Sequence, residues 1–265
     1  MIYVMSDIHG HYSRYRSVMN QIRLRKTDHL YVLGDCIDRN PFGLPILKEL
    51  YQKPNVTVLL GNHEHMMLDA LTKTHPDNEY IWRWYRNGGN ITHERYKHCT
   101  RAYRAEMLDI IRSLPVNVEV TCNGTDYLLV HGAPLGFHHK YGDPVMDSVW
   151  KRLDHASKIP EGKTVIFGHT PTDHYQVCKP MRIYHGNRMI GIDCGCAYKS
   201  GRLACLRLDD MKEFYSEQDW TPPEPEKIEE LIRENSRRQA CTILPFMIQS
   251  GLFPIRRSGR IGFRQ

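Results

Sequence analysis

Short apolar runs alternate with amphipathic segments through the first 60 residues of the chain. The runs Ile2–Met5, Leu30–Leu33 and Val56–Leu60 have the length and composition typical of buried strands. Between them, His11–Arg25 carries apolar residues at spacings of three and four, which predicts a helix, and Gly43–Tyr51 predicts a second one. The order strand, helix, strand, helix, strand predicts right-handed βαβ units and a largely parallel start to a sheet.

The alternation changes at about residue 65. Residues 65–115 are rich in helix formers and aromatic side chains, which predicts a helical insertion, and we expect Trp82 and Trp84 to fill its core rather than contact a substrate. After residue 115 short apolar runs return, and their close spacing favours antiparallel pairing in a second sheet. These later strands are predicted at Val116–Thr121, Tyr127–Val130, Thr164–Phe167, Met189–Ile192 and Ala204–Leu208.

Together these elements predict an α/β fold: a four-layer α/β/β/α sandwich of two mixed sheets with a helical insertion. A chain of 265 residues with 41% hydrophobic content is long enough for one large domain, which we expect at 1–221. Three prolines near residue 222 end this domain. For residues 222–265 we predict a C-terminal helix, Glu226–Arg238, and a basic tail.

Composition narrows the classes of protein to consider. No apolar run is long enough to cross a membrane, and the N-terminus lacks the pattern of a secretory signal, so we expect a cytoplasmic protein without a membrane partner. The eight cysteines form no Cys-x-x-Cys pair, and we expect Cys194 and Cys196 to be buried free thiols. The net charge is +6, half of it in the 222–265 tail, which suits an anionic substrate but gives little reason to expect nucleic acid.

Five polar clusters, most of them directly after an apolar run, combine Asp, Asn and His. These side chains are good ligands for Mn²⁺, Fe²⁺ and Zn²⁺. The first three clusters follow one another at intervals of about one βαβ unit, roughly 30 residues, so they should meet at one end of neighbouring strands. The clusters are Asp7-Ile8-His9, Gly34-Asp35-Cys36-Ile37-Asp38-Arg39, Gly61-Asn62-His63-Glu64, His131-Gly132 and Gly168-His169-Thr170.

In this order and spacing the five clusters closely resemble the motifs of the calcineurin-like metallophosphoesterases. The resemblance is greatest to the phosphoprotein phosphatase branch, which includes the phage lambda-type phosphatases and the symmetrical diadenosine tetraphosphatases, and it covers residues 2 to about 208. Pro171 stands where many other members have a second His, and this also favours that branch. Asn40 and Cys194 depart from the usual pattern. Three shorter segments also resemble this branch: Asn87-Gly88-Gly89, Trp150-Lys151-Arg152 and Ile192-Asp193-Cys194-Gly195.

The resemblance implies a centre of two divalent metal ions bridged by one carboxylate. Mn²⁺ is the expected ion, and Fe, Zn²⁺ and Ni²⁺ stay open because the mixed N and O ligands do not choose among them. The implied ligands are Asp7 and His9 for the first ion, Asn62, His131 and His169 for the second, and Asp35 for both.

The resemblance also implies the catalytic groups. A metal-bridging hydroxide would attack phosphorus in line, while Arg39 and Arg152 hold the phosphoryl oxygens, since a guanidinium matches phosphate geometry. His63 would protonate the leaving oxygen as general acid. Asp38 would hold its imidazole and raise its pKa toward neutrality.

The favoured function is a serine/threonine phosphoprotein phosphatase-like hydrolase acting on a phosphorylated protein or a small phosphoester. The alternative is a dinucleoside polyphosphate hydrolase, for example of diadenosine tetraphosphate, in which Trp82, Trp84 or Tyr85 would stack on a base. A non-catalytic metal-bound scaffold would have no use for a proton donor such as His63. A nucleic-acid phosphodiesterase would need a long basic groove, whereas the basic excess lies largely in the tail.

Overall fold

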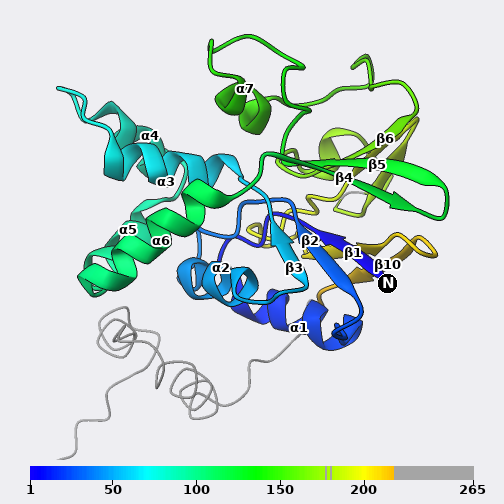
Figure 1. Cartoon of the computed structure of the whole chain (residues 1–265), viewed down its shortest axis with the longest axis horizontal. Coiled ribbons are helices and arrows are strands. Elements are labelled where there is room, and N and C mark those ends of the chain that lie inside the picture. The colour runs from blue at the N-terminus through cyan, green and yellow to red at the C-terminus, as the bar shows by residue number, and fades with distance from the viewer. Residues whose placement is uncertain (177, 180, 218–265) are drawn as a thin grey trace, which may run out of the picture.

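The computed structural model describes residues 1–176, 178–179 and 181–217 and contains two five-stranded sheets (Figure 1). The first sheet has the order β10-β9-β1-β2-β3. Its strands β1, β2 and β3 are parallel, as predicted, and are joined by α1 (Tyr12–Ile22) and α2 (Gly43–Tyr51). The strands of this sheet are β1 (Ile2–Met5), β2 (His29–Val32), β3 (Val56–Val58), β9 (Ala204–Arg207) and β10 (Lys212–Tyr215).

The second sheet has the order β4-β5-β6-β8-β7, and its pairing corrects part of the prediction. Only β4 with β5 and β7 with β8 are antiparallel, whereas β5, β6 and β8 run parallel. The reason is the connection from β5 to β6, which is long enough for a crossover. The predicted strand at 204–208 instead joins the first sheet, antiparallel to β1. The strands of the second sheet are β4 (Asn117–Cys122), β5 (Thr125–Val130), β6 (Lys163–Phe167), β7 (Tyr184–Gly186) and β8 (Met189–Gly191).

Alternation along the strands divides the core into layers. In β1, Tyr3 and Met5 pack among the residues that contact α1 and α2, while Val4 packs between the two sheets. In β6, Ile166 points into the same inter-sheet layer and Phe167 packs on the outer face of the second sheet. Successive strand residues therefore bury opposite faces, which is what a sandwich of sheets requires. The predicted sandwich of two mixed sheets is confirmed, with α1 and α2 on the outer side of the first sheet (Figure 1).

The helical insertion is also confirmed, and it forms one group of helices beside the sheets (Figure 1). Its first helix begins at Asn62, earlier than predicted, so the third polar cluster forms the first turn of a helix. Trp84 is fully buried as expected, but Trp82 is 57% exposed, so its predicted packing in the core is wrong. The helices of this half are α3 (Asn62–Thr72), α4 (Glu79–Arg86), α5 (Asn90–Lys97) and α6 (Arg101–Ser113), followed by α7 (Pro144–Trp150) and a 3₁₀ helix at Thr172–His174.

The remaining predictions concern the cysteines, membrane spans and the C-terminal segment. Cys194 and Cys196 are buried free thiols, as predicted. In the described ranges no helix combines the length and apolar character needed to span a bilayer. The predicted helix Glu226–Arg238 and the basic tail lie outside the described residues.

Candidate active site

The loops that follow β1 and β2 are locked together by backbone hydrogen bonds. The N–H of Asp7 donates to the carbonyl of Gly34 at 3.2 Å, and the N–H of His9 donates to the carbonyl of Asp35 at 2.9 Å. The clusters at the ends of these two parallel strands therefore lie against each other, as the spacing predicted. The third cluster enters from the first turn of α3, where the N–H of His63 donates to Asp35 Oδ1 at 3.0 Å.

Several of the proposed site residues have a left-handed backbone, which is uncommon outside glycine. Such conformations cost free energy and are retained where surrounding contacts fix them, often at functional sites. The residues and their φ values are Asp7 (56°), His9 (48°), Asp35 (53°), Asp38 (69°), Arg39 (64°) and His169 (63°).

The buried carboxylate of Glu64 holds the loop that follows β2 in its strained conformation. Its Oε1 accepts the N–H groups of Cys36 at 2.8 Å and Ile37 at 3.2 Å, and its Oε2 accepts those of Asp35 at 2.9 Å and Gly61 at 3.2 Å. Gly61 permits this approach, because a Cβ there would lie 2.2 Å from Asp35 Oδ1. No role for Glu64 was predicted from the sequence, although this residue follows His63 directly in the third cluster.

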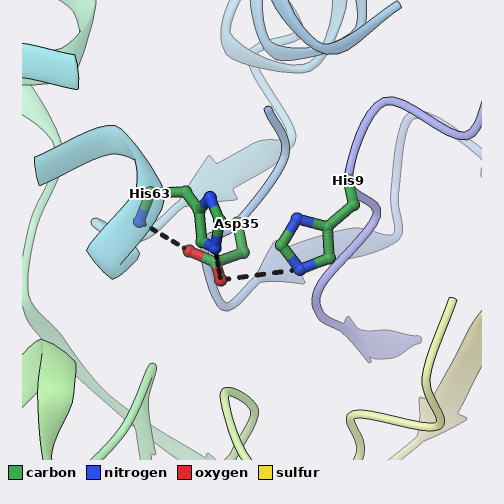
Figure 2. A group of neighbouring side chains, drawn as sticks. All are labelled: His9, Asp35 and His63. Carbon is green, nitrogen blue, oxygen red and sulfur yellow. Dashed lines mark hydrogen bonds and ion pairs between the residues drawn. The ribbon is translucent and has the colours of Figure 1, made fainter. Parts of the chain in front are cut away.

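A first group of donor atoms surrounds Asp35 on the side of the first sheet. His9 Nε2 lies 3.7 Å and His63 Nε2 3.8 Å from Asp35 Oδ2 (Figure 2). The donor atoms of these three side chains all lie within 4.8 Å of one another, a spacing that could hold a metal ion. Asp7 borders the group, with Oδ1 3.9 Å from His9 Nε2.

A second group gathers at the other oxygen of the same carboxylate, where His131 Nε2 lies 3.4 Å from Asp35 Oδ1. Donor atoms of Asp35, His131 and His169 lie within 4.8 Å of one another. The side-chain oxygen of Asn62 is 2.9 Å from His131 Nε2 and 2.9 Å from His169 Nδ1. The structure thus brings together all six residues that the resemblance implied as ligands. Asp35 belongs to both groups, which is the position of a bridging carboxylate.

The orientation of two imidazoles fits metal binding. His9 Nδ1 is 3.0 Å from the carbonyl of Ile37, and His131 Nδ1 is 2.7 Å from the carbonyl of Leu33. A carbonyl accepts the proton of Nδ1 and so leaves Nε2 with a free lone pair directed at Asp35. Such outer hydrogen bonds are the usual means of fixing the tautomer of a metal-binding His.

The electrostatics of the centre also fit a cation. Burial, followed by the charge of Asp193, raises the pKa of Asp7 well above its usual value, and burial followed by the charge of Glu64 does the same for Asp35. Burial lowers the pKa of His9 and of His169, which favours the neutral imidazole. A divalent ion can bind neutral imidazoles and would offset the repulsion between these neighbouring carboxylates.

The proposed acid and its partner form a close pair. His63 Nδ1 lies 2.6 Å from Asp38 Oδ2, and Arg39 Nη2 lies 3.2 Å from His63 Nε2. Burial raises the pKa of Asp38 to about 7. Burial, followed by the charges of Arg39 and His131, lowers the pKa of His63 well below its usual value. The expected rise in the pKa of His63 is therefore not found, because burial disfavours its charged form.

The two proposed phosphate-binding arginines differ in their surroundings. Arg39 is half-buried beside His63, whereas Arg152 is exposed in the segment that follows α7. Burial, followed by the charges of His131 and Arg152, lowers the pKa of His169, so the guanidinium of Arg152 lies close enough to act on this centre.

Comparison with known proteins gives relatives of two kinds. The family model described as calcineurin-like phosphoesterase matches residues 1–191. A symmetrical bis(5'-nucleosyl)-tetraphosphatase from Wigglesworthia glossinidia brevipalpis is 41% identical, over 80% of this chain and 97% of that protein. Serine/threonine-protein phosphatase 2 from Escherichia coli (strain K12) is 29% identical, over 78% of this chain and 92% of that protein.

A solved structure agrees with the fold. The protein serine/threonine phosphatase from Saccharomyces cerevisiae superposes with a TM-score of 0.55, at 14% identity, over 84% of this chain and 81% of that one. At this identity the likeness concerns the sandwich alone.

Proposed function

The chain belongs to the calcineurin-like phosphoesterase family, and on that basis we propose that it is a dinuclear hydrolase of the serine/threonine phosphoprotein phosphatase type. It is a metal-dependent phosphoesterase by family. The observation that carries the proposal is the carboxylate of Asp35, which two groups of imidazole nitrogens share. A metal pair with one bridging carboxylate needs this arrangement.

The proposed ligands are those implied by the sequence, and Mn²⁺ is the proposed ion. Asp7 and His9 would hold one ion with Asp35, and Asn62, His131 and His169 would hold the other with the same carboxylate. Two divalent ions in such a centre neutralise charge on a phosphoryl group and activate water. His63 has the spacing of a ligand too, but the cationic Arg39 at its Nε2 opposes a metal ion there.

We propose that the chain's own side chains bind the substrate and move the proton. Arg39 and Arg152 would bind phosphoryl oxygens, since guanidinium groups form paired hydrogen bonds with phosphate. His63 would donate its Nε2 proton to the leaving oxygen, with Asp38 holding the opposite nitrogen. The negative charge of a bound phosphoryl group would favour protonated His63 and offset the effect of Arg39.

A second substrate class is supported by two observations. One relative named as a symmetrical tetraphosphatase is 41% identical over nearly its whole length, and Trp82 presents an exposed indole on the insertion. A dinucleoside polyphosphate could stack a base on such a ring, which contributes roughly 1–3 kcal/mol per base.

A substrate panel on metal-stripped, Mn²⁺-reloaded protein separates the two. Phosphate release from phosphoserine and phosphothreonine peptides is compared with cleavage of diadenosine tetraphosphate, with p-nitrophenyl phosphate as a common reference. We expect faster turnover of the peptides. Preference for the dinucleotide by orders of magnitude, together with its loss in Trp82→Ala, would replace the phosphoprotein proposal with the nucleotide one. Failure to cleave any of these three kinds of substrate would contradict both.

A further inference from the structure

We propose that Trp84, in the helical insertion, is a positioning residue for the acid pair: its indole N–H fixes the carboxylate of Asp38, which in turn fixes His63. The inference rests on the proposed function, since it concerns the proton donor of that reaction. In this proposal the helical insertion helps to position the proton donor and does not only border the site.

Trp84 and His63 contact the same oxygen of the Asp38 carboxylate. Trp84 Nε1 donates to Asp38 Oδ2 at 2.8 Å, and the same oxygen lies 2.6 Å from His63 Nδ1. Asp38 and Trp84 are both fully buried, so water does not compete for this contact. In the described part of the chain the other oxygen, Asp38 Oδ1, has no hydrogen-bond partner. The hydrogen bond from the indole therefore restrains the rotation of the Asp38 carboxylate, whereas Oδ1 makes no hydrogen bond that would do so.

The second observation is how tightly the indole itself is seated. A Cβ at Gly89 would lie 2.2 Å from both Cδ1 and Nε1 of Trp84, so no other residue fits there without displacing the ring. The N–H of Gly89 donates to the carbonyl of Trp84 at 3.0 Å, and the ring of His93 lies 5.4 Å away, centroid to centroid. The Asn87-Gly88-Gly89 segment thus has a physical role, which is to make room for the indole.

The third observation connects the same turn to the substrate side. The N–H of Arg39 donates to the carbonyl of Gly88 at 3.2 Å. One turn of the insertion therefore supports both the backbone of the proposed phosphate-binding arginine and, through Trp84, the acid pair. When the indole N–H is lost, the carboxylate keeps its contact with His63 but loses one restraint on its rotation. The His63 imidazole is then held less firmly at its angle to the leaving oxygen, and a small misplacement of this kind costs roughly 10- to 100-fold.

The test uses the full chain loaded with Mn²⁺ and two substrates that differ in the need for an acid. Phenyl phosphate has a poor leaving group that requires a proton, whereas p-nitrophenyl phosphate leaves as a stable anion. Trp84→Phe keeps an aromatic ring and removes the N–H. We expect kcat for phenyl phosphate to fall roughly 10- to 100-fold and kcat for p-nitrophenyl phosphate to change much less, with unaltered metal content.

Matched variants make the result specific. Tyr80→Phe removes a polar atom from the same helix without touching Asp38 and should leave both rates unchanged. Gly89→Ala displaces the indole without removing it and should reproduce the selective loss, so the proposal can be tested even if Trp84→Phe fails to fold. Equal losses with both substrates in these variants, or no loss, would overturn the positioning role.

His63→Asn separates failure of this inference from failure of the proposed function. If His63→Asn shows the selective loss and the Trp84 and Gly89 variants do not, the acid role stands and only the role of Trp84 is wrong. If His63→Asn itself shows no difference between the two substrates, the acid assignment is wrong and the inference is overturned with it.

Discussion

The inner wall of the site, formed by Asp35, Asn62, His63 and His131, differs from the exposed side chains proposed for substrate binding, Arg152 and Trp82. Each inner residue is buried and hydrogen-bonded to a partner from another element. Arg152 and Trp82 are exposed, and in the described residues no hydrogen bond of their side chains appears. We therefore propose that the inner wall sets the reaction class, while the exposed residues leave the substrate open, in agreement with relatives of two kinds.

Asp35→Asn should have the largest effect, since it removes the charge that both donor groups share. We expect metal content to fall in both sites and turnover to fall by more than roughly 10³-fold on every substrate, because several kcal/mol of charge stabilisation are lost. Metal analysis after dialysis and phosphate release measure the two effects. Asp109→Asn, at an exposed carboxylate on α6, is the control.

His63→Asn should separate chemistry from metal binding within the inner wall. We expect turnover of poor leaving groups to fall roughly 10²–10⁴-fold, the usual scale for general acid catalysis, with metal content nearly unchanged. Loss of one metal equivalent instead would show that His63 is a ligand, as its distance to Asp35 alone would allow.

Glu64→Gln tests whether the inner wall depends on the carboxylate behind it. One amide N–H₂ would face backbone N–H groups that now donate to the carboxylate, so we expect a loss of roughly 3 kcal/mol in the free energy of unfolding. Metal affinity should fall roughly 10- to 100-fold, as for other partners that orient ligands. Chemical denaturation and metal titration measure these changes, and an unaltered affinity would contradict the role of Glu64.

Arg152→Ala should have the smallest effect and should depend on the substrate. An exposed guanidinium contributes one charge-assisted contact, so we expect roughly a 10-fold loss in kcat/KM. Metal content and stability should not change. A loss equal to that of His63→Asn on all substrates would place Arg152 with the inner wall and weaken the distinction between the two regions.

The parallel half of the fold could be predicted because the first three polar clusters follow one another at the spacing of a βαβ unit. The set of proposed ligands was implied by the resemblance of the five clusters to the family motifs. The sequence did not predict the role of Glu64 or of Trp84. Their contacts join residues far apart in the sequence, and neither has a periodic pattern to indicate it. The parallel pairing in the second sheet was missed because the prediction relied on close strand spacing, whereas the connection after Val130 is long enough for a crossover. The pKa of His63 depends on burial, which the sequence does not give.

The most direct test of the central claim is a titration of metal-stripped protein with Mn²⁺, in which bound metal and the rate of p-nitrophenyl phosphate hydrolysis are followed together. We expect two bound equivalents of Mn²⁺, with full activity reached only as the second binds. In Asp35→Asn both signals should be lost. Full activity with one equivalent, or in the stripped protein, would contradict a dinuclear centre bridged by Asp35.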